Sequence, residues 1–209
     1  MTKQEAIQAL KEGHKVRHKW FSNDEYLYME NGELYDEVCT YLPFDEIELA
    51  IVNSGIFNKR GDIFVPNVSW GLLNHEADMV VMTKSGYLTE IEIKRSWEDF
   101  KADFKKPHEH KDERVNKLYY CVPRSIKERV VDYLTENEIP FTGLLYFSEE
   151  GTIYEHNLGG HTRQWYTGGR KLFLEEQLTI ARLGCMRVWN LKQKLVDIMH
   201  DNESHKSRS

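Results

Sequence analysis

Three charged residues near the middle of the chain have the types and spacing needed to cleave a phosphodiester bond. They are Asp78, Glu92 and, two positions later, Lys94. Two carboxylates held about 5 Å apart on neighbouring strands can share one divalent cation. A lysine beside them can hold a water molecule or stabilise negative charge on the phosphorus oxygens. The residues therefore point to metal-dependent hydrolysis, provided that the fold brings them together.

The segment 78–94 is predicted to form the β-hairpin that would do so. Apolar residues alternate on both sides of Lys84-Ser85-Gly86, and glycine supplies the positive φ that a tight turn needs. If these three residues form the loop, Asp78 lies opposite Glu92. Because a strand returns every second side chain to the same face, Lys94 shares that face, and the intervening isoleucines point to the other.

This arrangement resembles the PD-(D/E)XK nuclease superfamily, in which an acidic residue on one strand is followed by Glu-x-Lys on the next. It is more similar to the MmcB-like DNA repair nucleases and their phage relatives, over about residues 44–160. The similar motifs are Glu76-Ala77-Asp78, Glu92-Ile93-Lys94-Arg95-Ser96, Asp99-Phe100-Lys101-Ala102-Asp103 and Tyr119-Tyr120-Cys121-Val122-Pro123. The resemblance implies a restriction-endonuclease-like mixed β-sheet flanked by helices, a Mg²⁺ or Mn²⁺ cofactor and a 5′-phosphate product.

Two further glutamates are candidate metal ligands. The resemblance implies a glutamate on the first helix of the domain, and Glu48 lies nearer that helix's apolar stripe than Glu46 does. Glu76 would share a face with Asp78 if both were on one strand, as a ligand or only as a hydrogen-bond partner. Two simpler interpretations stay open: an ordinary hairpin whose charged residues lie on its exposed face, and helix glutamates that are merely solvated.

Basic residues in two regions are candidate phosphate contacts. Lys101 and Lys105 lie four residues apart, on one side of the helix predicted after Lys94. Arg163, Arg170 and Lys171 lie in or just after a glycine-rich segment that also contains two aromatic residues, a combination suited to gripping a nucleic-acid strand. The alternative is that these runs are solvated surface. His108 and His110 are interpreted as surface histidines rather than as metal ligands.

Composition limits the class of protein. The chain has 209 residues and a net charge of −6, which opposes general affinity for nucleic acids and makes local charge decisive. The absence of a run of 18 apolar residues and of a signal-peptide pattern predicts no membrane contact and a cytoplasmic location. The resemblance to MmcB-like nucleases and their phage relatives implies that this is the cytoplasm of a bacterial or phage-infected cell. Three widely spaced cysteines predict reduced thiols rather than disulfides.

The chain is predicted to have three parts. Residues 1–41 form a small α+β module whose hairpin turns at Asn31-Gly32, residues 42–200 form the nuclease-like domain, and residues 201–209 form a polar tail. In the large part, alternating strands and helices predict an α/β fold with a mixed sheet flanked by helices. The sequence also predicts a capping box at Ser125 and a possible helix break at Gly184.

Two functions from different classes follow. The first is a metal-dependent nuclease acting on DNA, in repair or in phage DNA metabolism. The second is a catalytically silent nuclease-fold binding protein, a phage or host-interaction factor whose N-terminal module makes the contact. The Asp/Glu/Lys set favours the first, and the acidic net charge favours the second. DNA versus RNA, endo- versus exonuclease action and oligomeric state stay open.

Overall fold

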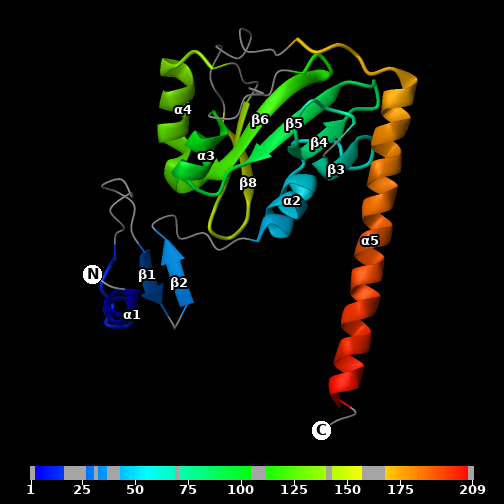
Figure 1. Ribbon diagram of the computed structural model, residues 1–209. Coiled ribbons are helices and arrows are strands. Elements are labelled where there is room, and N and C mark those ends of the chain that lie inside the picture. The colour runs from blue at the N-terminus through cyan, green and yellow to red at the C-terminus, as the bar shows by residue number, and fades with distance from the viewer. Residues whose placement is uncertain are drawn as a thin grey trace.

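A six-stranded mixed β-sheet forms the centre of the protein (Figure 1). The computed structural model describes residues 3–16, 27–30, 33–36, 43–68, 71–104, 112–139, 143–156 and 168–206. The strands are β3 (Ile63–Val68), β4 (Ala77–Met82), β5 (Leu88–Ile93), β6 (Val115–Pro123), β7 (Gly143–Phe147) and β8 (Ile153–His156), and they lie in that order across the sheet. The central strands β5, β6 and β7 are parallel, and the other neighbours are antiparallel.

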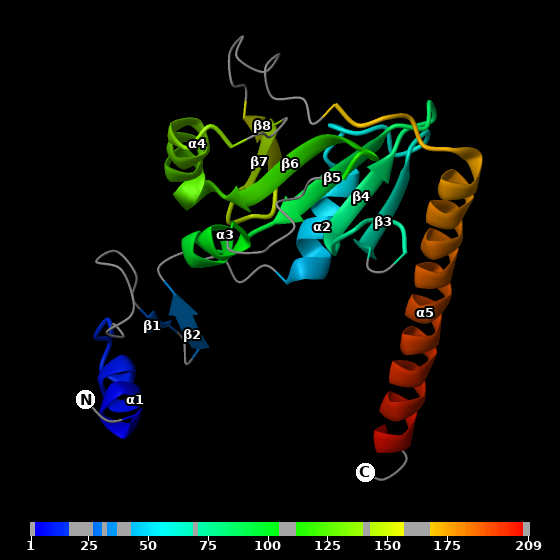
Figure 2. The same cartoon turned by 45° about the horizontal axis from the view of Figure 1, so that its top comes forward.

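Helices cover both faces of this sheet (Figures 1 and 2). Helix α2 (Phe44–Asn53) packs on one face, and α3 (Trp97–Asp103) and α4 (Lys127–Glu136) pack on the other. The long helix α5 (Leu174–Lys206) begins beside β3, and a short 3-10 turn, η1 (Arg124–Ile126), leads from β6 into α4. The predicted α/β class with a mixed sheet flanked by helices is confirmed.

Apolar side chains hold these layers together. Between α2 and the sheet, Ile47 and Ile51 of the helix pack against sheet residues that include Met79, Val81, Ile91 and Ile93. The opposite face carries two separate apolar groups. One lies around β3, β4 and the start of α5 (Val65, Val80, Met82, Leu88, Ile180), and the other lies under α3 and α4 (Phe100, Leu118, Tyr120, Val130, Leu134, Leu144).

Between these two groups the sheet buries charged residues. Glu90 and Glu92 of β5, and Lys94 just beyond it, are each at most 3% exposed. Burying a charge is costly unless it is paired and hydrogen-bonded. The partners of these side chains therefore determine both the stability and the chemistry of this region.

The N-terminal residues form small elements of their own. Helix α1 (Lys3–Lys11) precedes an antiparallel pair, β1 (Leu27–Glu30) and β2 (Glu33–Asp36). Glu30 pairs with Glu33, which is the register that a two-residue turn at Asn31-Gly32 requires. Those turn residues lie outside the described residues. The domain boundary at residue 41 stays a prediction.

Two local predictions differ from the structure. Helix α5 passes through Gly184 without a break and continues to Lys206, into the segment assigned to the polar tail. Gly184 packs close to Val65 of β3, and such packing overrides the weak helix propensity of glycine. Ser125 does not cap a helix, because it lies inside η1 and the N-cap position of α4 is Ile126.

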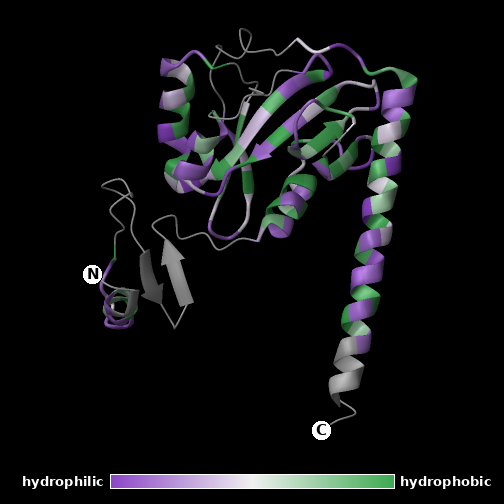
Figure 3. Cartoon of the chain, viewed as in Figure 1, coloured by the Kyte–Doolittle hydropathy of each residue, from purple (hydrophilic) through white to green (hydrophobic). Residues whose placement is uncertain are grey.

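The distal half of α5 extends away from the sheet (Figures 1 and 3). Its large apolar side chains are exposed, including Trp189, Leu191, Leu195, Ile198 and Met199. No helix among the described residues is both long and apolar enough to span a bilayer.

Two glycines give opposite predictions for stability. A Cβ on Gly169 would overlap the backbone carbonyl of Val115, so Gly169→Ala should lower the free energy of unfolding by about 1–3 kcal/mol. A Cβ on Gly184 would lie 3.4 Å from Val65 Cγ2, which leaves room for a methyl group, so Gly184→Ala should raise it by up to about 1 kcal/mol. Urea denaturation of both variants measures the difference, and equal effects would contradict the packing described.

Candidate active site

The hairpin has the predicted register. Met82 pairs with Leu88 and Val80 pairs with Glu90, while the Thr83 amide donates a 2.9 Å hydrogen bond to the Tyr87 carbonyl. Gly86 adopts a φ of +84°, as the turn requires. The ladder places Asp78 beside the end of β5.

Asp78 is held there by the backbone of β5. The Ile93 amide donates a 2.8 Å hydrogen bond to Asp78 Oδ2. This contact fixes the carboxylate at the carboxyl end of the strand that carries Glu92. In open α/β sheets, ligands bind at the carboxyl ends of the parallel strands.

The ammonium group of Lys94 is the centre of the site. Lys94 Nζ lies 2.6 Å from Glu92 Oε2, 3.1 Å from Asp103 Oδ1 and 3.7 Å from Asp78 Oδ2. The structure thus brings together the three predicted catalytic residues and adds Asp103, the last residue of α3. Sequence reasoning missed this aspartate, although it follows the core residue Phe100 at a spacing of three, which places both on one helix face.

Most of this cluster is buried. The side chains of Glu92, Lys94 and Asp103 are at most 4% exposed, and only Asp78, at 29%, opens to solvent. The simpler interpretation of charged residues on an exposed hairpin face is therefore wrong. Strand β5 is central, and α3 covers the face that these side chains occupy.

Lys94 is held in its charged form. Burial alone would lower its pKa, but Glu92, Asp103 and Asp78 together raise the pKa above its ordinary value. The ammonium can therefore donate hydrogen bonds and stabilise negative charge at neutral pH, but it cannot accept a proton there.

Glu48 reaches the same end of the sheet from α2. Its Oε1 accepts a 3.3 Å hydrogen bond from Asn67 Nδ2, at the end of β3. Burial and the charges of Asp45 and Asp78 raise the pKa of Glu48 to about 7. Repulsion between the carboxylates of Glu48 and Asp78 contributes to this rise, and a shared cation would relieve it.

The other predicted metal ligand, Glu76, is placed differently. It precedes the first residue of β4 and is exposed, and no contact with the cluster is found for it among the described residues. A strand would have put it on the face of Asp78, but the strand begins one residue too late. The structure gives no support to Glu76 as a ligand.

The donor set fits a hard cation, with one condition. Carboxylate oxygens from Asp78, Glu92 and Glu48 are the ligands that Mg²⁺ and Mn²⁺ prefer. Within the described parts of the chain, no three histidine, cysteine, aspartate or glutamate side chains are already close enough to hold a metal ion. Lys94 lies between Glu92 and Asp78, so its ammonium must move for the carboxylates to close on a cation.

A second buried pair lies one step further along β5. His75 Nε2 is 2.8 Å from Glu90 Oε1, and His75 Nδ1 is 2.7 Å from Asn74 Oδ1. The Asn74 amide in turn donates to Asp112, which Arg114 holds by two guanidinium hydrogen bonds. The sequence signal for this pair was Glu90 itself, two residues before Glu92 on the same face of a strand.

Tyr120 of β6 adjoins both groups of acids. Burial and the charges of Asp103, Glu92 and Glu90 raise the pKa of Tyr120 well above its ordinary value. Its hydroxyl therefore stays protonated. It pairs in register with Glu92 on the neighbouring strand, so it forms part of the wall of the site.

The predicted phosphate contacts are only partly described. Lys101 pairs with Glu98 and lies over the Trp97 ring, and Lys171 is exposed. Arg170 is bound on both sides, with Arg170 Nη2 2.7 Å from Glu176 and Arg170 Nε 3.1 Å from Glu113. These ion pairs give Arg170 a structural role, and its contact with nucleic acid stays a prediction. Lys105 and Arg163 lie outside the described residues, as do His108 and His110.

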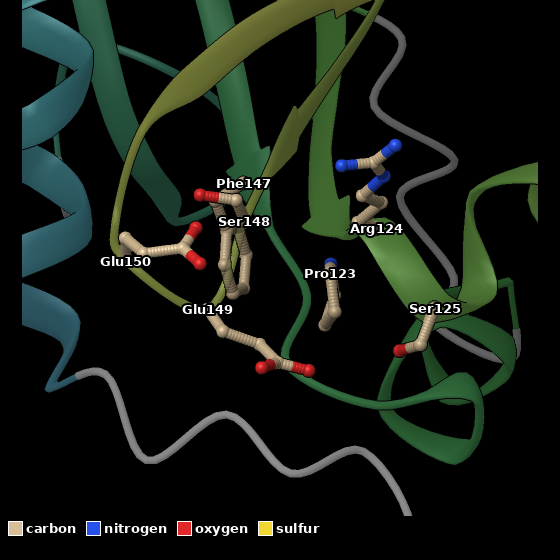
Figure 4. A pocket seen from close by; sticks show the side chains of 7 residues that line it. All are labelled: Pro123, Arg124, Ser125, Phe147, Ser148, Glu149 and Glu150. Atoms are coloured by element: carbon tan, nitrogen blue, oxygen red, sulfur yellow. The ribbon is translucent and has the colours of Figure 1, made fainter.

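A cleft lies at the carboxyl ends of β6 and β7 (Figure 4). It has a volume of about 340 Å³ and is lined by the last residue of each of these strands and by residues that follow them: Pro123, Arg124, Ser125, Phe147, Ser148, Glu149 and Glu150. Because β5, β6 and β7 are parallel, their carboxyl ends lie at the same end of the sheet as this cleft. The cleft and Lys94, which directly follows β5, therefore lie at the same end of the sheet.

Comparison with known proteins supports the fold alone. No protein-family model and no curated protein sequence matches the chain. The structure is similar to that of the SPO1766 protein of unknown function from Silicibacter pomeroyi, with a TM-score of 0.50 and 15% sequence identity. The similarity covers 76% of this chain and 94% of that one. It supports a common α/β architecture.

The raised pKa of Glu48 predicts a pH dependence of stability. A carboxyl whose pKa rises from 4.5 to about 7 on folding stabilises the protein fully below pH 4.5, and this contribution is lost as pH rises through 7. Glu48→Gln should therefore reduce the difference in unfolding free energy between pH 4.5 and pH 7.5. Chemical denaturation at both pH values measures it, with Glu46→Gln, exposed on the same helix, as the control.

Removing the ammonium group of Lys94 should lower the stability of the protein by an amount that depends on pH. Lys94→Met leaves Glu92 and Asp103 as buried charges without their ammonium, at a cost of about 3–5 kcal/mol at pH 8. Their folded-state pKa values would then lie above the unfolded ones, so the cost should be smaller at pH 5. Thermal denaturation tests this, and the double variant Lys94→Met/Glu92→Gln should recover part of the loss. An equal loss at both pH values would refute the assignment.

Proposed function

We propose that the protein is a divalent-metal-dependent nuclease of PD-(D/E)XK type that hydrolyses phosphodiester bonds in DNA. The observation that carries this proposal is the convergence of Asp78, Glu92 and Lys94 at the end of a hairpin in a mixed α/β sheet. A role in DNA repair or phage DNA metabolism, in the cytoplasm of a bacterial or phage-infected cell, follows from the resemblance of the motifs.

The charge of the site supports a cation. Asp78, Glu92 and Asp103 surround a single ammonium group, and Glu48 lies near Asp78. An excess of buried negative charge is relieved either by a proton or by a positive ion. Asp78 and Glu92 would hold Mg²⁺ or Mn²⁺, with Glu48 as a third ligand. The bound ion would polarise the phosphodiester and lower the pKa of a coordinated water.

The residues of the chain have separate tasks in this proposal. Lys94, held as an ammonium, donates hydrogen bonds to the attacking water or to a phosphoryl oxygen, where negative charge develops. Asp103, 3.1 Å from Lys94 Nζ, would hold that ammonium in place if Glu92 bound a cation. Tyr120 stays a neutral phenol and excludes solvent from the buried side of the cluster.

The alternative is a catalytically silent binding protein built on the same fold. The close Lys94–Glu92 contact favours it, because the site neutralises part of its charge without a metal. The net charge of −6 also favours a partner other than nucleic acid. The two proposals differ in one measurable property, which is cleavage in the presence of a divalent cation.

Asp78→Asn is the variant best suited to test the nuclease. It removes one charge at the most exposed member of the cluster, and its amide oxygen can still accept the Ile93 hydrogen bond. We expect the wild-type protein to cleave DNA with Mg²⁺ or Mn²⁺, and the variant to be at least about 100-fold slower. The assay uses single-stranded, duplex and branched DNA, with RNA in parallel.

Thermal denaturation of the same proteins tests the metal site separately. A cation that binds only the folded state raises the melting temperature by mass action, and Asp78→Asn should remove most of that shift. Glu46→Gln, which removes an exposed charge from α2, should behave like the wild type in both assays. An identical shift in Asp78→Asn would place the cation elsewhere. Metal binding at Asp78 without cleavage of any substrate would favour the silent binding protein.

A further inference from the structure

Several basic residues lie near the carboxyl ends of β5 and β6, the end of the sheet at which the candidate site lies. Arg95 directly follows Lys94, and Arg124 directly follows the last residue of β6. The helices that follow these strands carry three more: Lys101 on α3, and Lys127 and Arg129 on α4. We call these five residues, Arg95, Lys101, Arg124, Lys127 and Arg129, the basic rim.

Four of the five cations lie over aromatic rings. Arg129 Cζ is 4.1 Å and Lys101 Nζ is 5.5 Å from the centre of the Trp97 ring. Arg95 lies 5.3 Å from the Phe44 ring of α2, and Lys127 lies 4.8 Å from the Tyr146 ring of β7. A cation within about 6 Å of a ring face is attracted to it, which restricts the side chain without neutralising its charge.

The five rim residues differ among themselves in their acidic partners. Lys101 pairs with Glu98, and Lys127 pairs with Glu128. By contrast, none of Arg95, Arg124 and Arg129 forms an ion pair with a carboxylate among the described residues, and all three are exposed. Arg114 and Arg170 are instead bound by acids of the fold. Among the described residues, the charges of Arg95 and Arg129 are therefore available for a partner, whereas Arg124 also interacts with Glu150 of the adjoining cleft.

Their positions enclose the site from both sides of the sheet. Arg95 rests on α2, which covers one face, and Arg129 rests on Trp97 of α3, which covers the other. Lys94 lies between them, directly after the last residue of β5. Figure 4 shows the side chain of Arg124 across the adjoining cleft from Glu149 and Glu150.

We propose that the basic rim, with Arg95 and Arg129 as its main contacts, binds the phosphate backbone of the nucleic acid and draws it across the site. This inference rests on the proposed nuclease function and names the surface that the substrate uses. A guanidinium stacked on a ring leaves the N–H groups along its edge free to donate, and these match the oxygens of a phosphate. Backbone contacts of this kind give position and affinity rather than base specificity.

The test measures how nucleic-acid affinity depends on salt. Fluorescence anisotropy of labelled duplex DNA, with every protein carrying Asp78→Asn to prevent cleavage, gives the slope of log K against log salt concentration. Arg95→Gln/Arg129→Gln should reduce that slope by about 1.8, because each lost duplex contact removes about 0.9. The control is Lys59→Gln/Arg60→Gln, which removes the same charge from the exposed loop before β3. That loop lies at the opposite end of the sheet from Lys94. Ile63 pairs with Met82, and Met82 pairs with Leu88, the first residue of β5.

The outcomes separate this surface from the proposed function. A flattened slope in the rim variant only, with an unchanged circular dichroism spectrum, supports the rim. Equal effects of the two double variants, or no effect of the rim variant, overturn it, and so does loss of binding on Arg163→Gln/Lys171→Gln alone. Cleavage by the wild-type protein is scored independently. A rim-dependent slope without cleavage keeps the surface and rejects the nuclease, while cleavage with a rim-independent slope keeps the nuclease and rejects the surface.

Discussion

One buried ammonium group determines how this part of the protein is organised. Lys94 contacts carboxylates from three different elements, with Asp78 at the start of β4, Glu92 on β5 and Asp103 at the end of α3. Without that cation, the acids would repel one another in an environment of low polarity, where repulsion is strong. The ion pairs therefore fasten the hairpin to the helix that follows it, and they set the geometry of the site at the same time.

The sheet explains why such a cluster can exist. Strand β5 separates two apolar groups on one face, and its charged residues occupy the gap between them. The apolar groups supply the stability, and the gap supplies a region of low polarity in which a charged group acts strongly on its neighbours. The buried His75–Glu90 pair continues the same row, so the charged residues form a line through the sheet rather than an isolated pair.

The sequence predicted the parts of the site that depend on local order. Hairpin register follows from alternation and from Gly86. The helix predicted after Lys94 is α3, and it begins after Ser96, whose side chain accepts a hydrogen bond from the Asp99 amide. Asp103 was missed because its partnership depends on how α3 packs against the sheet. The burial of Glu92 was also unexpected, since alternation gives the face of a residue but does not tell what covers it. At Gly184 and Ser125, tertiary packing and the η1 turn overrode local propensity.

Helix α5 has an uneven attachment along its 33 residues. Ile180 is buried against the sheet, and Arg187 donates a hydrogen bond to the Asn67 carbonyl, but from 188 to 200 the side chains are exposed. An isolated helical segment of that length is marginally stable in water, so its distal turns are held mainly by continuity with the packed ones. Amide hydrogens near residue 180 exchange with solvent only when the core unfolds, whereas those beyond residue 190 exchange through local fraying of the helix. Deuterium uptake along α5 thus rises steeply from one end of a single helix to the other.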